Sequence, residues 1–404
     1  MTARAPEQRR YTITDETLRD GLQSPKVLQP SIEQSLILFA LMKSSGIEKA
    51  DIGFANSNPL TRARVLEVAK LNLQEGGSPM EVSCAARTMP GDITPIIEIS
   101  QQIGSKVGAD TFIGTDPDRI KAEGWSLAQM VKNVEDTTRY AVEHGVPTMI
   151  VTETSFIGIE RIPNTVRQIY LAALNAGANR VCLCDTTGVQ LPFEIARGVR
   201  WMRKLLDSHG FKDVGIDFHA HNDSFGAVPN TIEALRAGAD RGHATIFGVG
   251  ERAGNASLIP VLLQMDRLGM GENHNLKILP AYAFAASEAL GIPIPDDEPG
   301  VGKDSLTMTS GVHAASVLKA LRKNVDGASG VYLAFDYAKK MGIKPSHSTN
   351  IGQQAGEANV RLWCFVNELP EPTQAQVERV LSAAKQQDQR GFLTDKQILR
   401  LLIK

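Results

Sequence analysis

The chain has 404 residues, with 43 Lys and Arg against 45 Asp and Glu, and 42% of its residues are hydrophobic. This near-neutral composition is typical of a globular protein with a sizeable core, and it points to neither a nucleic acid nor an anionic membrane as partner. We expect a cytoplasmic protein, because the amino terminus lacks a signal peptide, no stretch reaches the ~18 apolar residues of a membrane span, and the four cysteines form no disulfide framework.

Short β-branched stretches alternate with longer amphipathic stretches in the first two thirds of the chain. The first amphipathic stretch, 31–46, opens with the capping-box pattern of Ser31 and Gln34 and closes on Gly46. Eight strand–helix alternations over ~260 residues predict an α/β fold, the (β/α)₈ or TIM barrel, over a doubly wound sheet. The expected strands are 11–15, 49–54, 80–86, 106–114, 147–153, 180–185, 214–221 and 243–250.

The pattern changes after the last expected barrel helix, 255–269. We expect an N-terminal arm over 1–10, the barrel over 11–272 and a small, mostly helical C-terminal domain over 273–404. The helices expected in that domain are 281–291, 310–324, 332–342, 359–369 and 373–387.

Unusual polar residues gather at the predicted carboxyl ends of the strands, where a barrel of this type carries its chemistry. His219 and His221 are two positions apart on an extended segment, so their imidazoles point to one face. Asp20, after the first strand, completes a three-ligand site for Mg²⁺, Mn²⁺ or Zn²⁺. The alternative is a histidine pair in a polar barrel mouth without metal, and the placement of the pair at a strand end favours the metal.

Arg19 and Gly21 flank Asp20, and this stretch has two readings. It could simply cap the first strand, since Asp and Gly are turn formers. Beside a metal, a guanidinium instead neutralises a developing oxyanion, and Gly21 lets the backbone approach a ligand closely. Cys182 and Cys184 share one strand face, where we expect packing.

A glycine-rich segment, 248–257, joins the eighth strand to a helix. Glycines at such a junction can admit phosphate at a helix amino end, although their spacing differs from the dinucleotide fingerprint. A plain tight turn and a functional loop are equally compatible with this spacing.

The stretches TLRDG (17–21), CDTTG (184–188), HAHND (219–223) and GERAGNASL (250–258) occur in order on successive expected elements. With them the chain resembles the 2-isopropylmalate, homocitrate and citramalate synthases, metal-dependent barrel enzymes related to hydroxymethylglutaryl-CoA lyase. The resemblance implies a homodimeric acyltransferase that uses a divalent metal to condense acetyl-CoA with a 2-oxo acid. The products would be a 2-alkylmalate-type acid and CoA. It also predicts no leucine-binding regulatory domain.

The resemblance further implies roles for individual residues. Arg19 would face the ketone oxygen, Glu153 and His313 would serve as acid–base residues, and His313 would act from its own subunit or across a dimer. The metal ligands would be Asp20, His219, His221 and Asn255; the substrate-binding residues would be Arg19, Gln23 and Thr186; and Gly250, Glu251 and Arg252 would contact CoA or form a loop.

Two departures from the family pattern bear on these expectations. Met308 stands where relatives often carry a further histidine, which weakens the proton-transfer assignment of His313. Phe156 and Ile157 stand where many synthases have Arg, which predicts a more apolar pocket and a bulky or apolar 2-oxo acid in place of 2-oxoglutarate. This last point is a hypothesis.

Two other functions are compatible with the same scaffold. A lyase or aldolase would cleave a hydroxyacyl-CoA, but the glycine-rich loop of the lyase carries a cysteine and residues 247–257 contain none. A non-catalytic homologue would keep the metal and lack turnover. Met308, in place of the further histidine of the relatives, is the observation that suggests this alternative.

Overall fold

The computed structural model describes residues 11–74, 79–271, 273–325, 327–343, 347–387 and 391–403. The expected N-terminal arm, 1–10, lies outside the described residues. The chain divides into two compact units, Met1–Pro293 and Ile294–Lys404.

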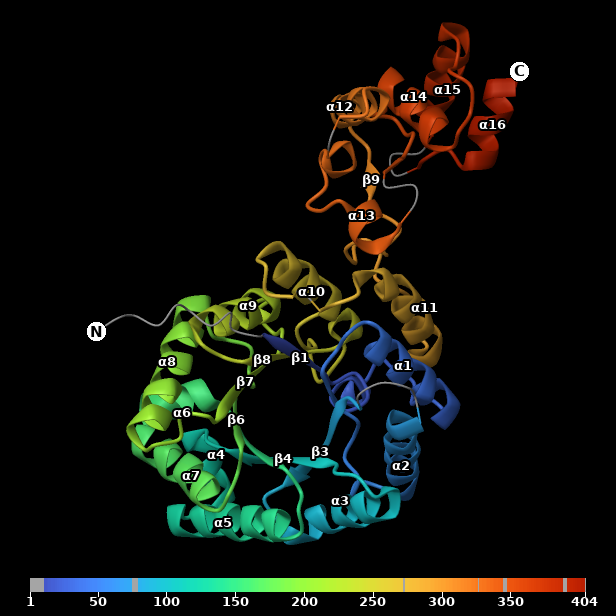
Figure 1. The fold of residues 1–404 in the computed structure, drawn as a ribbon. Helices are drawn as coiled ribbons and strands as arrows, with labels where there is room; N and C mark the ends of the chain where they lie inside the picture. Colours follow the sequence, from blue (N-terminus) through green and yellow to red (C-terminus); the bar gives the residue numbers. More distant parts are fainter. Residues whose placement is uncertain are drawn as a thin grey trace, which may run out of the picture. The chain divides into compact units, whose positions relative to one another are not determined.

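The first unit is a closed barrel of eight parallel strands in sequential order, which confirms the predicted fold (Figure 1). The strands are β1 (Thr12–Asp15), β2 (Lys49–Asp51), β3 (Glu81–Arg87), β4 (Gly108–Gly114), β5 (Thr148–Glu153), β6 (Arg180–Asp185), β7 (Gly215–Ala220) and β8 (Arg241–Ala244). The helices are α1 (Ile32–Ser44), α2 (Pro59–Gln74), α3 (Pro90–Ile103), α4 (Pro117–Glu123), α5 (Leu127–Glu143), α6 (Ser155–Arg161), α7 (Pro163–Asn175), α8 (Pro192–Ser208), α9 (Ala227–Ala237), α10 (Leu258–Arg267) and α11 (Leu279–Leu290).

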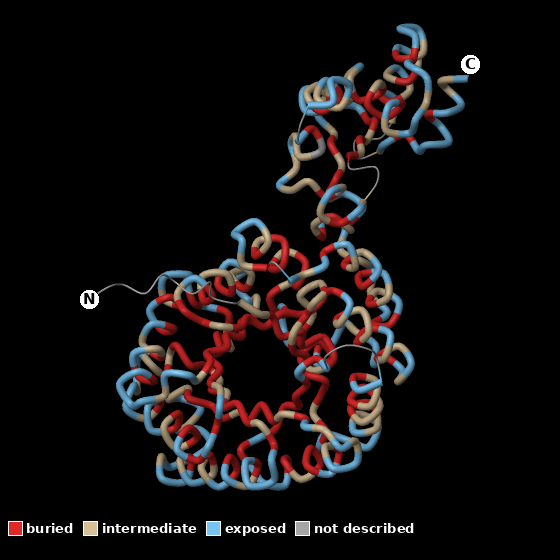
Figure 2. Tube along the Cα trace, in the orientation of Figure 1, coloured by how far each residue is buried: buried red, intermediate tan, exposed pale blue. Residues whose placement is uncertain are grey.

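Local sequence signals set the ends of these helices. The capping box at the start of α1 is present, because Ser31 accepts a hydrogen bond from the Gln34 amide and the Gln34 side chain bonds the Ser31 amide. Gly46 adopts a positive φ of 83° just after α1, a conformation that glycine reaches without strain. Buried residues follow the strands and the inner faces of the helices around the ring (Figure 2).

Strand β8 starts and ends earlier than the predicted 243–250. It covers Arg241–Ala244, and a short 3₁₀ turn, Ile246–Gly248, follows it. Phe247 has a left-handed φ of 54°, which an extended strand cannot accommodate. Strand β2 is also shorter than expected and ends at Asp51.

The first unit extends beyond residue 272 to Pro293. Helix α11 packs against α1, and its Tyr282 hydroxyl donates a hydrogen bond of 2.8 Å to Asp15 at the end of β1. The boundary therefore lies later than the expected one, because this helix belongs to the barrel unit.

The second unit is mostly helical. It contains β9 (Thr307–Met308), α12 (Gly311–Arg322), α13 (Tyr337–Met341), β10 (Ser348–Thr349), α14 (Glu357–Val366), α15 (Gln374–Lys385) and α16 (Asp395–Ile403). The two-residue strands pair in parallel and were not expected, and neither was α16. Helix α13 is shorter than the predicted 332–342, because Tyr332 has a left-handed φ of 61°.

None of the helices in the described part of the chain is both long enough and apolar enough to cross a lipid bilayer.

Candidate active site

A cavity of about 310 Å³ opens inside the barrel at the carboxyl ends of its strands. Most of the residues expected at the site line it, from the segment after β1 and from β5, β7 and the loops after β6 and β8. They are Arg19, Asp20, Gln23, Glu153, Thr186, His219, His221, Glu251 and Arg252. The structure thus brings nine of the expected residues to one cavity.

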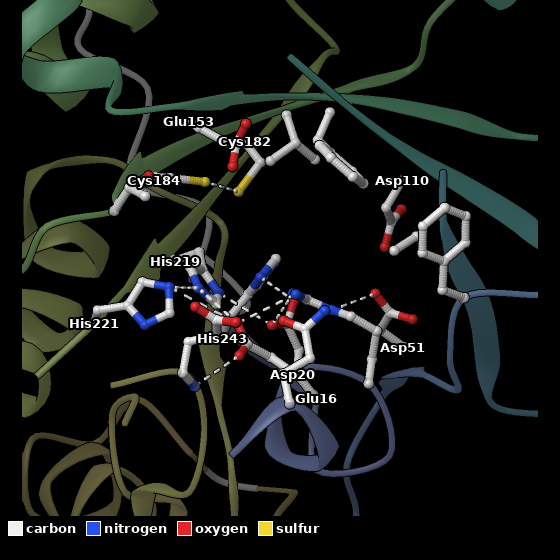
Figure 3. A pocket seen from close by; sticks show the side chains of 18 of the residues that line it. Glu16, Asp20, Asp51, Asp110, Glu153, Cys182, Cys184, His219, His221 and His243 are labelled. Carbon is white, nitrogen blue, oxygen red and sulfur yellow. Dashed lines mark hydrogen bonds and ion pairs between the residues drawn. The ribbon is translucent and has the colours of Figure 1, made fainter. Parts of the chain in front are cut away.

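Asp20, His219 and His221 are buried and meet at one side of the cavity (Figure 3). The Nε2 atoms of the two histidines lie 3.3 Å apart, and Oδ2 of Asp20 lies 3.4 Å from Nε2 of His219 and 3.8 Å from Nε2 of His221. The histidines come from β7 and the residue directly after it, and the alternation of side chains along a strand gives both rings the same face.

Burial, and the neighbouring His219, lower the pKa of His221 to about 4, so this imidazole is neutral at pH 7. Burial opposes ionisation of Asp20, but the Arg19 guanidinium together with the neighbouring His219 and His221 outweighs it and holds the pKa of Asp20 well below its usual value. A neutral imidazole and an ionised carboxylate are the forms that coordinate a cation.

Asn255 lies beside this group. A Cβ atom placed on Gly250 would come within 2.2 Å of Asn255 Nδ2 and 3.2 Å of Asp20 Oδ1, so the two side chains flank the same glycine. The Asn255 amide donates to the carbonyl of Val249 at 3.0 Å, and its buried Oδ1 has no hydrogen-bond partner among the described residues. Buried polar atoms are almost always hydrogen-bonded, so an unpaired buried oxygen is suited to bind a metal ion.

Arg19 is held by three carboxylates. Its Nε lies 3.1 Å from Asp51, its Nη1 lies 3.2 Å from Asp20, and its Nη2 forms an ion pair with Glu16. These contacts fix the plane of the guanidinium at the wall of the cavity.

Glu153 ends β5, and its Oε2 accepts a hydrogen bond of 2.7 Å from Nη1 of Arg119. Arg119, at the start of α4, also stacks over the ring of Trp125 with 5.6 Å between guanidinium carbon and ring centroid. Thr154, the next residue after Glu153, has a left-handed φ of 57° and donates its amide to Thr186 Oγ1 at 2.7 Å. Glu153 and Thr186 are therefore linked across neighbouring strands.

His313 belongs to the other compact unit. It lies in the first turn of α12 in the second unit, where its ring stacks on Tyr332 with centroids 4.3 Å apart. Gly250, in the first unit, does not line the cavity, and its contribution is the space that it leaves between Asp20 and Asn255.

Phe156 and Ile157, the expected apolar part of the pocket, lie elsewhere. Phe156 is buried against Phe218, with ring centroids 5.9 Å apart, and against Gly198 of α8. Neither residue lines the cavity, so the argument from these two positions about the substrate is wrong.

The apolar lining comes from other residues, which we call the apolar wall. It consists of Phe54, Ala85, Phe112, Met149, Val151, Cys182 and Cys184. The sulfur atoms of Cys182 and Cys184 lie 3.9 Å apart, and both residues also pack with Met149, as expected of core cysteines.

Four acidic or basic residues lining the cavity were not expected at the site: Glu16, Asp51, Asp110 and His243. His243 was missed because the predicted strand began there. The observed start at Arg241 would have shown that residues 241 and 243 share a face. Asp185, which the sequence placed at a strand end with the others, accepts hydrogen bonds from the amides of Val189 and Gln190 and so shapes its own loop.

The family model described as HMGL-like matches residues 10–284 of the chain. The chain belongs to the HMGL-like family.

Relatives of this HMGL-like chain include homocitrate synthase AksA of Methanopyrus kandleri, which is 31% identical over 77% of this chain and 74% of the relative. The (R)-citramalate synthase of Aquifex aeolicus is 27% identical over 97% of this chain and 72% of the relative. Among solved structures, hydroxymethylglutaryl-CoA lyase from Pseudomonas aeruginosa matches with a TM-score of 0.57 and 18% identity, covering 72% of this chain and 95% of the other. The similarity to the lyase structure shows a shared fold and no more.

Proposed function

We propose that the protein condenses acetyl-CoA with a 2-oxo acid, and that water then cleaves the thioester of the adduct to give a 2-alkylmalate-type acid and CoA. The observation that carries this proposal is the meeting of Asp20, His219 and His221 beside the Arg19 guanidinium in one cavity. The relatives named homocitrate synthase and citramalate synthase support the same reaction class.

A divalent cation fits these residues. Asp20, His219 and His221 each offer one ligand atom within 4.8 Å of the others, and Asn255 Oδ1 is buried and unpaired among the described residues. Bound here, the cation would polarise the ketone of a 2-oxo acid and neutralise part of its carboxylate charge. The donor set of nitrogen and oxygen atoms, without thiolate, suits Mg²⁺, Mn²⁺ or Zn²⁺.

Arg19 supplies the second positive charge. A carbon nucleophile that attacks the ketone leaves an alkoxide, and a guanidinium fixed at the cavity wall stabilises it without reorganising during the reaction. Thr186 and Gln23, which line the same cavity, offer hydrogen bonds to the substrate carboxylate.

The methyl proton of acetyl-CoA is too weakly acidic to leave without a positioned base. We assign this task to Glu153, whose carboxylate lines the cavity and is oriented by Arg119. His313 remains a proposed partner in proton transfer, from its own subunit or across a homodimer.

The lining favours a 2-oxo acid that carries an apolar side chain and one carboxylate. The apolar wall takes the substituent, whereas the excess of acidic over basic residues in the lining disfavours a second carboxylate. The two cations that line the cavity are already paired, Arg19 with three carboxylates and Arg252 with Asp223 at 3.0 Å.

The test is to incubate the protein with Mg²⁺ or Mn²⁺, acetyl-CoA and a panel of 2-oxo acids, to follow free thiol release and to identify the product by mass. We expect release with an apolar monocarboxylic substrate. No release with any 2-oxo acid would overturn the proposal, cleavage of a hydroxyacyl-CoA would indicate a lyase, and 2-oxoglutarate as best substrate would overturn the specificity.

Variants test the metal site separately. Asp20→Asn and His219→Ala should lose metal and thiol release together, because each removes a ligand. A variant that kept the full metal content would remove its residue from the ligand set.

A further inference from the structure

A second buried cluster, Glu16, His219 and His243, adjoins the proposed metal ligands. The Glu16 carboxylate lies between the two rings. Its Oε2 is 3.0 Å from Nδ1 of His219, and its Oε1 is 2.7 Å from Nδ1 of His243. Each Nδ1 atom is buried and has no hydrogen-bond partner in the described part of the chain, so the ion-pair contact with Glu16 is the polar contact that the structure gives it. Glu16 is therefore the group that these two nitrogens face.

His243 is held from its other side as well. Its Nε2 lies 3.1 Å from Oδ2 of Asp217, a fully buried residue of β7. Oδ1 of Asp217 in turn accepts a hydrogen bond of 2.7 Å from Nε of Arg180. The cluster thus continues as an unbroken chain of contacts from Arg180 through Asp217 and His243 to Glu16 (Figure 3 shows the last two with His219).

The two ring nitrogens of His219 have different surroundings. Nδ1 faces Glu16, while Nε2 faces His221 and Asp20. A neutral imidazole carries its proton on one nitrogen and its lone pair on the other. A carboxylate at Nδ1 keeps the proton there and turns the lone pair of Nε2 toward the ligand group.

We propose that Glu16 is a positioning residue that fixes the tautomer and ring orientation of His219 as a metal ligand, and that His243 acts through Glu16 by holding its second oxygen. The inference rests on the metal site proposed above. Glu16 does not enter the ligand set itself, because both of its oxygens already face imidazole nitrogens and Oε2 also pairs with Arg19.

Metal affinity of the whole protein, without acetyl-CoA or 2-oxo acid, tests this role. Titration of Mn²⁺ by calorimetry should give Glu16→Gln a Kd about 10- to 100-fold above that of the wild-type protein, the usual effect of losing such a partner. The unliganded variant should keep its fold by circular dichroism. A Kd within about threefold of wild type in a folded variant would overturn the proposal.

Asp92→Asn is the matched control, because it also neutralises a buried carboxylate that pairs with an arginine. Asp92 accepts hydrogen bonds from Arg87 and Asn56 and does not line the cavity. Its Mn²⁺ affinity should equal that of the wild type. An equal loss in Asp92→Asn and Glu16→Gln would count against a specific role for Glu16.

His243→Gln and the double variant test the chain of contacts. The single change should weaken Mn²⁺ binding by less than Glu16→Gln does, and the double variant should be no weaker than Glu16→Gln alone, because His243 acts through Glu16. Losses that add fully would overturn this part of the proposal.

Nitrogen-15 NMR of histidine-labelled wild-type protein with Mg²⁺ decides the matter if Glu16→Gln does not fold. A proton on Nδ1 of His219 supports the proposal, and a proton on Nε2 overturns it. Metal binding without thiol release would refute the condensing activity and leave this inference standing. Normal metal binding by folded Glu16→Gln would overturn this inference and leave the proposed condensing activity standing.

Discussion

Gly250 shows how a single residue without a side chain sets the geometry of the site. It separates Asp20 from Asn255, and any side chain at this position would overlap the Asn255 amide. The resemblance connected Gly250 with CoA or with a loop. Its surroundings in the structure point to a steric role beside the proposed metal ligands.

Gly250→Ala should therefore lower Mn²⁺ affinity by roughly tenfold or more, because the new Cβ displaces Asn255 or Asp20. Calorimetric titration measures this. Gly91→Ala is the control, since a Cβ at Gly91 meets nothing within 4 Å. Unchanged affinity in Gly250→Ala would show that Asn255 and Asp20 tolerate the shift or that they do not bind the metal.

The buried carboxyl group of Asp15 makes the stability of the protein depend on pH. Burial raises its pKa from 3.8 to about 6, so between these values the folded protein holds a proton that the unfolded chain has lost. Its contribution to stability is complete below about pH 4 and falls as the pH rises through 6. Asp15→Asn should gain on the order of 3 kcal/mol relative to wild type between about pH 4 and pH 7, measured by urea unfolding at each pH. A constant difference across this range would contradict the assignment.

At the scale of elements, periodicity and capping residues predicted most of the barrel. Strands β1 and β3 to β7 lie within one or two residues of the expected ranges, because alternating β-branched residues and turn signals are local properties. The end of β8 and the start of α13 could not be predicted, because left-handed residues such as Phe247 and Tyr332 are set by their tertiary surroundings.

The site itself was predictable in part. The face shared by His219 and His221 follows from strand alternation alone, and Asp20 from the barrel topology. The contact between Glu16 and His243 was not found, because it joins β8 to the segment after β1, and no short-range pattern reports such a pair. The apolar wall was assigned to the wrong residues for the same reason.

Helix α11 offers a test of an element that sequence assigned to the second unit. Tyr282→Phe removes the hydroxyl that donates to Asp15, and it should lower the free energy of unfolding by about 1–2 kcal/mol because a buried acceptor loses its donor. Urea unfolding followed by tryptophan fluorescence measures the change. Tyr11→Phe, at a partly exposed position, is the control and should unfold like the wild type. No loss in Tyr282→Phe would mean that α11 does not depend on this bond.

At the scale of the whole molecule, the two units have separate cores. The second unit buries Val360, Trp363, Val377 and Val380 in a cluster of its own. The metal ligands proposed here all lie in the first unit, whereas His313 lies in the second.

A chain ending at Pro293 should therefore bind Mn²⁺ with wild-type affinity and release no thiol. The full chain with His313→Ala should fold, bind metal and lose most of kcat, since one acid–base group contributes roughly 10²–10⁴-fold. Thiol release and calorimetry report the two properties. Full turnover by His313→Ala would remove His313 from the mechanism.

The interior of the barrel keeps the proposed metal ligands apart from the apolar wall. The segment after β1 and the strands β7 and β8 carry Asp20, His219, His221 and His243, while strands β3 to β6 carry nearly all of the apolar wall. Changes in Met149, Val151 or Phe112 can therefore alter the substrate that fits while the metal site stays intact. The barrel thus places the proposed metal ligands and the residues that would select the substrate on different strands.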